Sequence, residues 1–120
     1  MKVSAVALLF CSLVSPSLAD DHVDNIDIAA QITASVLASQ EVCKYIGIEI
    51  DADVLSVRVL AHGVTKDERG SAAFKALVQK DYELTLNQFS KNPADTCYMA
   101  LSSYGPEGPE YQRGILRTKR

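Results

Sequence analysis

Apolar residues recur at intervals close to multiples of 3.6 along four stretches of the chain, which predicts helices. The apolar stripe of the first stretch consists of Ile28, Ile32, Val36 and Cys43. Asp24 or Asn25 is a suitable amino-terminal cap, and Gly47 is a suitable end. We therefore expect a first helix that starts near these caps and carries Cys43 on its buried face, in the last turn.

The second stretch follows Asp51, a typical amino-terminal cap, and Gly63 is a suitable end. Its apolar face consists of Val54, Val57, Leu60 and Ala61. The β-branched residues of this stretch also suit a strand, but we expect a helix because the chain offers no convincing second strand to pair with it. The alternation of Ile48, Glu49 and Ile50 is too short to predict a sheet.

The third helix has a start signal in its sequence. Thr65 and Glu68 have the spacing of a capping box, in which each side chain bonds the backbone of the other residue. Gly70 weakens the first turn, so the helix could instead start at Ser71. The stripe of this helix consists of Phe74, Leu77, Val78, Tyr82, Leu86 and Phe89.

Asn92 and Pro93 predict the start of a fourth helix, because asparagine is a good cap and proline suits the first helical position. Its inner stripe consists of Cys97, Leu101 and Tyr104, and Gly105 ends it. Residues 105–120 contain prolines and glycines with little pattern. We therefore expect a helical domain of residues 20–104 and an extended, basic carboxyl-terminal tail of residues 105–120.

Residues 1–19 have the composition of a secretory signal peptide that is cleaved. Lys2 supplies the positive charge, an apolar run from Val3 to Val14 follows, and Ala19 suits the position before the cut. The apolar run is too short to span a bilayer. We therefore expect a periplasmic or secreted protein without an integral membrane segment, with 101 of the 120 residues left after the leader is removed.

Cys43 and Cys97 are the cysteines outside the leader. In an oxidising compartment an even pair predicts one disulfide, and neither cysteine has the close partner that a metal or redox motif needs. The bond would join the end of the first helix to the start of the last. The fold expected is all-α, a small four-helix bundle-like domain held by one disulfide.

The formal net charge is −3 for the whole chain, and it becomes −4 without the leader, which contains Lys2 and no acidic residue. This charge disfavours nucleic acid as a partner, because no positive field attracts phosphates. Aspartates gather near the amino end, and the basic residues near the carboxyl end are Arg113, Arg117, Lys119 and Arg120. The two groups could attract each other or stay independently solvated.

Cleavage after Ala19 would leave a mature chain that begins with Asp20, Asp21 and His22. The free amine, two backbone amides and the imidazole then supply the tetragonal nitrogen set that Cu(II) and Ni(II) prefer. The arrangement needs histidine in third place and no proline in second place, and the sequence meets both conditions. Metal binding at the mature amino terminus is therefore one hypothesis, and an accidental match is the alternative.

No nucleophile elbow, zinc-protease motif or phosphate loop occurs in the sequence. His62 could act as a general base, but a histidine near a helix end also interacts favourably with the helix dipole. Tyr98, Tyr104 and Tyr111 accompany the last helix and the tail, where they could contact a partner protein or seal the end of the bundle. We expect no catalytic residues and, apart from the copper or nickel hypothesis, no cofactor.

The run from Cys97 to Gly108, followed by Gly114, Ile115 and Leu116, resembles the carboxyl ends of small exported helical proteins of alphaproteobacteria, which also carry an earlier cysteine. In plan, the chain is similar to the periplasmic acid-stress chaperones of the HdeA type, because both combine a leader with a short helical chain and one disulfide. No motif is shared with those chaperones, so the resemblance implies no functional residue.

These observations favour a non-catalytic exported protein that binds another protein, as a chaperone, an inhibitor or an accessory subunit. A Cu(II)- or Ni(II)-binding protein is the first alternative, and a small enzyme using His62 is the second. For a chaperone, acid would neutralise the carboxylates while the basic residues stay charged. The resulting repulsion would loosen the bundle, and the disulfide would limit its expansion.

Overall fold

The computed structural model describes residues 18–119, with side chains from His22 onward. Residues 1–17, most of the predicted leader, lie outside this part of the chain. Its helices are α2 (Leu18–Val42), α3 (Ala52–Ala61), α4 (Lys66–Arg69), α5 (Ala72–Phe89) and α6 (Pro93–Tyr104). It also contains a 3₁₀ turn, η1 (Lys44–Ile46), and two short strands, β1 (Ile48–Ile50) and β2 (Leu116–Thr118). The expected all-α class is confirmed, with a minor two-stranded sheet added.

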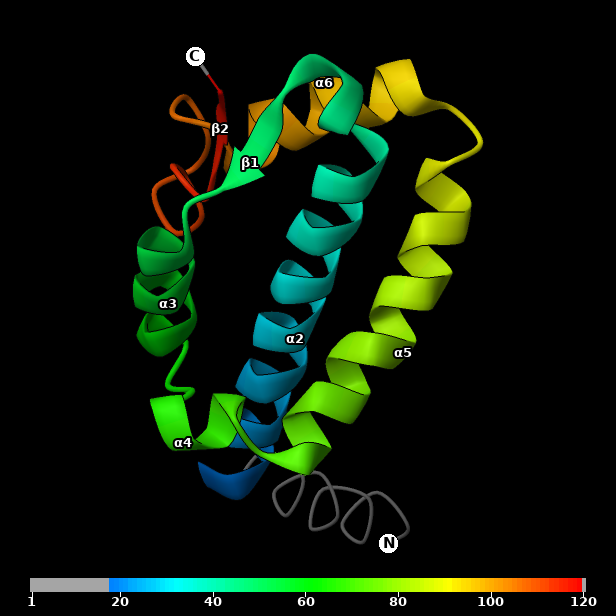
Figure 1. Ribbon diagram of the computed structural model, residues 1–120. Coiled ribbons are helices and arrows are strands. Elements are labelled where there is room, and N and C mark those ends of the chain that lie inside the picture. Colours follow the sequence, from blue (N-terminus) through cyan, green and yellow to red (C-terminus); the bar gives the residue numbers. More distant parts are fainter. Residues whose placement is uncertain (1–17, 120) are drawn as a thin grey trace, which may run out of the picture.

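Helix α2 lies at the centre of the bundle, with α5 along one side and α3 along the other (Figure 1). Helix α6 and the two strands lie together at the carboxyl-terminal end of α2, whereas α4 lies near its amino-terminal end (Figure 1). None of the helices within residues 18–119 is both long enough and apolar enough to span a membrane.

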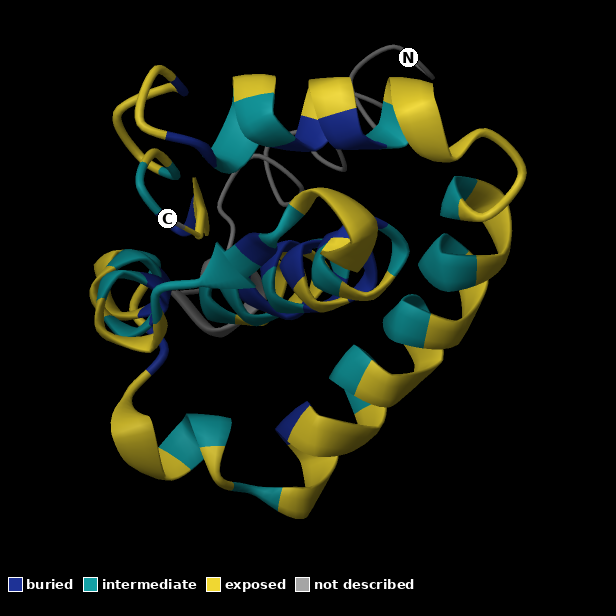
Figure 2. Cartoon of the chain, turned by 45° about the horizontal axis from the view of Figure 1, so that its top comes forward, coloured by how far each residue is buried: buried dark blue, intermediate teal, exposed yellow. Residues whose placement is uncertain are grey.

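Helix α2 is buried on more than one side because many of its residues are small. Its buried residues are Ala29, Ala30, Ile32, Ala34, Val36, Ala38 and Ser39. Small side chains let neighbouring elements approach this helix closely, so it becomes the central element (Figure 2). Two expectations for this helix are wrong: it runs through Asp24 and Asn25 instead of starting there, and Ile28 is 42% exposed.

The expected starts of the helices after α2 are confirmed in their local chemistry. Asp51 caps α3 by accepting hydrogen bonds from two backbone N–H groups, and Asn92 caps α6. Thr65 and Glu68 form both bonds of a capping box. This box starts the short helix α4, and Ser71 then caps the long helix α5.

The expected buried face of α3 is wrong. Leu55 and Val59 are buried, whereas Val57 and Leu60 are each 59% exposed. A helix with apolar residues on several sides can turn either face inward, and the neighbouring elements decide which face is covered. Arg58 contributes to this choice, since its Nε and Nη2 donate to the carbonyl of Arg113 at 3.1 and 3.0 Å.

The extended tail predicted for residues 105–120 is a further correction, because much of this segment packs onto the domain. Ile115 and Leu116 are both fully buried. Strands β1 and β2 pair antiparallel, with Ile50 opposite Leu116 (Figure 1). The N–H of Asp51 also donates to the carbonyl of Ile115 at 2.8 Å. The domain therefore continues past residue 104 and includes β2.

Glycines allow the chain to fold back between α6 and β2. The carbonyl of Gly105 accepts hydrogen bonds from the N–H groups of Gly108 and Gly114, both at 3.0 Å. A Cβ atom at Gly108 would overlap the carbonyl oxygen of Ser103, and Gly114 has a positive φ of 84°. Residues that show little pattern in the sequence therefore form a compact loop.

The basic carboxyl end pairs with acidic groups close to it. Arg117 donates to Glu49 Oε1 and to Asp51 Oδ2, both at 3.0 Å. The aspartates of the amino end belong to the start of α2. Strand β2, which contains Arg117, lies near the other end of α2 (Figure 1). Arg117 therefore connects β2 to β1 and to the cap of α3.

Candidate functional site

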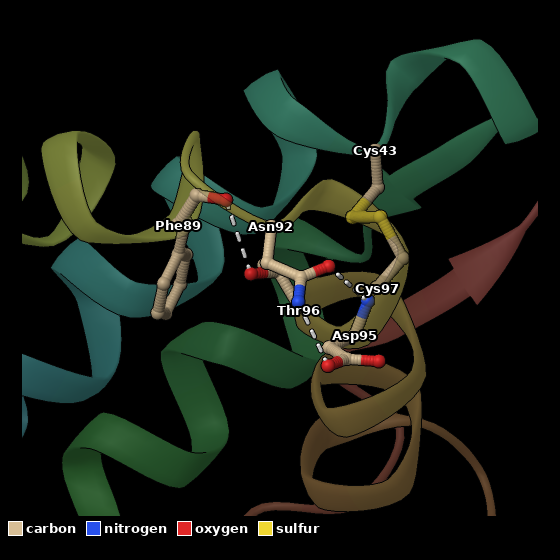
Figure 3. Close-up of a disulfide and its surroundings, with 6 residues drawn as sticks. All are labelled: Cys43, Phe89, Asn92, Asp95, Thr96 and Cys97. Carbon is tan, nitrogen blue, oxygen red and sulfur yellow. Dashed lines mark hydrogen bonds between the residues drawn. A yellow bond between two sulfur atoms is a disulfide. The ribbon is translucent and has the colours of Figure 1, made fainter.

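The predicted disulfide between Cys43 and Cys97 is present, with a Cα–Cα distance of 5.7 Å. Cys43 directly follows α2, and Cys97 lies near the start of α6, so the bond ties these helices together (Figure 3). The hydroxyl of Thr96 donates to the carbonyl of Phe89 at 3.2 Å and holds the end of α5 against α6 (Figure 3). Three helices are therefore fixed at this end of the bundle.

An exposed tyrosine lies close in sequence to each cysteine of this disulfide. Tyr45, two residues after Cys43, is 64% exposed, and Tyr98, next to Cys97, is 72% exposed. The disulfide limits the distance between the two tyrosine Cα atoms to about 17 Å, given 3.8 Å for each intervening step along the chain. Ile46 is also exposed. We call Tyr45, Ile46 and Tyr98 the tyrosine patch.

Charged residues border the tyrosine patch. Lys44 Nζ donates to Glu41 Oε2 at 2.7 Å, and both side chains are exposed. The hydrogen bond and the charge of Glu41 raise the pKa of Lys44 above its ordinary value of 10.5, so this lysine stays charged. Tyrosine is enriched at protein-binding surfaces, whereas lysine and glutamate are depleted there and occur mainly in the polar rim.

The structure separates the three tyrosines that the sequence groups together. Tyr98 and Tyr111 are exposed, whereas Tyr104 is half-buried and packs against the core. Burial raises the pKa of Tyr104 above its ordinary value of 10.0, and a hydrogen bond with Ser35 opposes this shift. Sequence reasoning missed Tyr45, although its position two residues from a disulfide cysteine was a usable signal.

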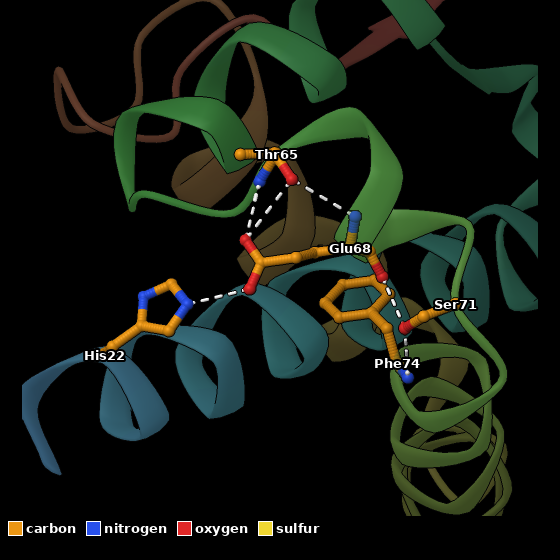
Figure 4. A network of polar contacts seen from close by, with 5 residues as sticks. All are labelled: His22, Thr65, Glu68, Ser71 and Phe74. Carbon is orange, nitrogen blue, oxygen red and sulfur yellow. Dashed lines mark hydrogen bonds and ion pairs between the residues drawn. The ribbon is translucent and has the colours of Figure 1, made fainter. Parts of the chain in front are cut away.

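His22, the candidate metal ligand, contacts α4. Its Nε2 lies 2.7 Å from Glu68 Oε2, at which distance the Nε2–H donates to the carboxylate (Figure 4). The backbone N–H of Thr65 donates to the other oxygen of Glu68 at 3.0 Å. The hydrogen bond from the Thr65 backbone holds the pKa of Glu68 below its ordinary value of 4.5, and the bond from His22 lowers this pKa by a smaller amount. Glu68 therefore connects the start of α2 to the capping box of α4.

The other metal ligands of the amino-terminal candidate site would be backbone groups, namely the free amine and two amides. Residues 20 and 21 belong to helix α2, and their side chains lie outside the described part of the structure. Between residues 18 and 119, the His, Cys, Asp and Glu side chains form no group of three that could hold a metal ion. A cage of one amine, two amides and one imidazole needs no such group, so this finding does not bear on the copper hypothesis.

His62, the candidate general base, is the residue after α3 and forms its carboxyl-terminal cap. Its Nε2 is buried and has no hydrogen-bond partner within the described residues. A general base needs a group that orients it and a nucleophile within reach. Within residues 18–119 neither an orienting group nor a nucleophile is hydrogen-bonded to this nitrogen, so an enzymatic role for His62 stays a hypothesis from the sequence.

Comparisons of the chain with protein-family models, with curated proteins and with solved structures give no match. The similarity to alphaproteobacterial exported proteins and to acid-stress chaperones therefore stays a prediction from the sequence.

Proposed function

We propose that this chain is a non-catalytic exported protein that binds another protein through the tyrosine patch, as a chaperone, an inhibitor or an accessory subunit. The observation that carries the proposal is the exposure of Tyr45 and Tyr98, each of which lies close in sequence to one cysteine of the disulfide. Tyrosine is enriched at protein interfaces because it offers a large rigid apolar body and a polar tip.

The disulfide supports both parts of this proposal. A stable disulfide is typical of oxidising compartments, which agrees with a periplasmic or secreted location. The same bond links the start of η1 to α6, so the backbone that carries Tyr45 and Tyr98 loses little freedom when a partner covers the two residues. The expected partner presents an apolar segment that packs between the two tyrosines.

Crosslinking in cells tests the patch. A photo-crosslinking phenylalanine derivative replaces Tyr45 or Tyr98, and it replaces Leu84 as a control, because Leu84 is 60% exposed on a different helix. We expect adducts with the same protein from positions 45 and 98 and none from position 84. Equal labelling from all three positions would contradict the proposal.

The captured protein is then purified and its affinity measured directly. Tyr45→Ala and Tyr98→Ala should each weaken binding by about tenfold, as expected for aromatic residues at the centre of an interface. Leu84→Ala should leave the affinity unchanged. Equal affinity of all variants would show that the patch is not the binding surface.

A second candidate function is Cu(II) or Ni(II) binding by Asp20, Asp21 and His22, and the contact of His22 favours it. The Nε2 of His22 faces Glu68, which leaves Nδ1 for a metal. Metal-binding histidines commonly donate their other ring N–H to a carboxylate, which orients the ring and makes it a better ligand. Glu68 is placed for that role, provided that cleavage after Ala19 creates the free amine.

Metal titration of the chain that begins at Asp20 tests this candidate. We expect one Cu(II) per chain with a visible absorption band of square-planar geometry, which is lost in His22→Ala or when one residue precedes Asp20. Glu68→Gln should lower the affinity by about tenfold, while His62→Ala serves as the control. Unchanged copper binding in His22→Ala would exclude the amino-terminal cage.

A further inference from the structure

An open cleft of about 380 Å³ lies between α2, the end of α5 and α6. Its walls are mostly apolar, and two aromatic residues, Phe89 and Tyr104, line it together with Met99. A ligand can reach all three, because Phe89 and Tyr104 are half-buried and Met99 is 59% exposed. A mostly apolar cleft of this volume with few polar groups is typical of a site for a small ligand.

Phe89 lines the cleft but stays outside the apolar core. It is the last residue of α5. Within the described residues it is not among the half-buried apolar side chains that pack against the core, whereas Tyr104 is one of them. Part of the Phe89 side chain therefore stays in contact with water, and a ligand that covers it gains the free energy of burying apolar surface.

The walls of the cleft are held in place before any ligand arrives. The bond between Cys43 and Cys97 ties α6 to the end of α2. The hydroxyl of Thr96, another lining residue, donates to the carbonyl of Phe89 and so holds the end of α5 (Figure 3). A preformed cleft loses little conformational freedom when it is filled, which favours binding.

The charge of the lining residues limits the chemistry of the ligand. Within the described part of the chain, Asp95 is the one charged residue that lines the cleft, and it is exposed in the first turn of α6. Asn92 Nδ2 donates to Asp95 Oδ2 at 2.9 Å, and no other described residue forms a hydrogen bond with Asp95 Oδ1 (Figure 3). This carboxylate attracts a cationic ligand and repels an anionic one.

Aromatic residues beside a carboxylate suit one class of cation in particular. The face of an aromatic ring carries partial negative charge and attracts a ligand cation that lies over it. A fully methylated ammonium group has no N–H that needs an acceptor, so apolar walls can cover it without leaving a polar group unpaired. Recognition of such groups by aromatic residues is a common use of this attraction.

We propose that this cleft binds a small organic cation, a methylated ammonium compound that contacts the aromatic residues Phe89 and Tyr104 and pairs with the carboxylate of Asp95. The cleft has room for about a dozen non-hydrogen atoms, taking roughly 30 Å³ for each. None of its lining residues belongs to the tyrosine patch, so this binding goes beyond the proposed function and can be tested independently of it.

Three probes of similar shape test the proposal by amide NMR titration of the oxidised protein. Choline carries a trimethylammonium group, tert-butylethanol has carbon in place of the nitrogen, and pivalate carries a carboxylate on the same tert-butyl group. We expect choline to shift the resonances of Phe89, Met99 and Ala100, and to bind about tenfold more tightly than tert-butylethanol. Pivalate should not shift these resonances. Equal affinity for choline and tert-butylethanol, or choline shifts that leave the cleft unaffected, would overturn the proposal.

A charge variant tests the role of the carboxylate. Asp95→Asn should weaken choline binding by about threefold, the usual effect of an exposed ion pair, and leave tert-butylethanol binding unchanged. Asp53→Asn is the matched control, because Asp53 is also an exposed aspartate in the first turn of a helix and lies outside the cleft wall. Equal choline affinity in the two variants would refute the role of Asp95.

Variants of Phe89 test the role of its ring. Phe89→Leu keeps an apolar side chain but removes the aromatic face, so it should weaken choline binding by about fivefold and leave tert-butylethanol binding unchanged. Phe89→Tyr keeps the ring and should retain choline binding. Unchanged binding of tert-butylethanol also shows that the cleft is intact in each variant. If Phe89→Leu weakens both probes equally, the ring acts only as apolar surface and the proposal is wrong.

Discussion

At one end of the bundle, a disulfide, a two-stranded sheet and fully buried Ile115 and Leu116 hold α2, α6 and the carboxyl-terminal segment together. At the other end, His22 meets Glu68 through one partly exposed polar contact, and the short helix α4 depends on its capping box. The two ends differ in the kind of interaction that stabilises them. Covalent and apolar interactions persist in acid and salt, whereas exposed polar contacts weaken.

This difference also separates the candidate functions. The tyrosine patch lies near the rigid end, where a preformed surface favours binding without rearrangement. The candidate metal ligand His22 lies at the polar end, where protonation of Glu68 in acid weakens their contact. Changes at the two ends should therefore have effects of different size and different pH dependence.

Removal of the disulfide should have the largest effect. In Cys43→Ser/Cys97→Ser the unfolded chain regains the freedom of a loop with a sequence separation of 54 residues, which costs about 4 kcal/mol of unfolding free energy. Chemical denaturation measures this loss. Reductant should destabilise the parent protein but leave the double variant unchanged, and a double variant as stable as the parent would refute the role of this bond.

Leu116→Ala should have the next largest effect, because it leaves a hole where β2 meets the core. Truncation of a fully buried leucine costs about 3 kcal/mol. The neighbouring Arg117→Ala is the control, since it removes exposed ion pairs worth about 0.5 kcal/mol. If both variants lose the same small amount of unfolding free energy in urea denaturation, the segment around β2 is not part of the core.

At the polar end, Thr65→Ala removes the cap of α4 and should cost about 1 kcal/mol. Thr118→Ala, at an exposed position of β2, is the matched control and should change the unfolding free energy by less than about 0.5 kcal/mol. Thermal unfolding measures both variants. Loss of amide protection in α4 alone would locate the effect, and equal melting temperatures would contradict the capping role.

The smallest effect should be the pH dependence due to Glu68. Because its folded pKa is below the ordinary value of 4.5, its charge stabilises the protein above that pH, and this contribution is lost as the pH falls through the folded pKa. Glu68→Gln should therefore lower the melting temperature near neutral pH but have little effect in acid. Glu110→Gln is the exposed control. A difference that persists unchanged in acid would refute this assignment.

Sequence reasoning predicted part of the candidate site. It identified His22 as a possible ligand because this residue would be third in the chain after the expected cleavage, and Tyr98 as a possible contact because tyrosines accompany the last helix and the tail. It did not identify Glu68 as a partner of His22, since 46 residues separate them.

The features that the sequence by itself determined are local ones or depend on residue chemistry. Asp51, Thr65, Ser71 and Asn92 start helices because a cap needs only a side chain and backbone N–H groups two or three residues away. The disulfide follows from the two cysteines that remain once Cys11 is set aside with the expected leader. Each of these features can be predicted without knowledge of the rest of the fold.

Only the tertiary structure decided which apolar face is covered and which segment completes the sheet. Val57 and Leu60 are as apolar as Leu55 and Val59, but the latter face the core. Ile48 and Thr118 are paired across 70 positions, and neither short strand is stable alone. Burial depends on what packs against a residue, so the central position of α2 and the folded carboxyl-terminal segment emerge only when distant parts of the chain meet.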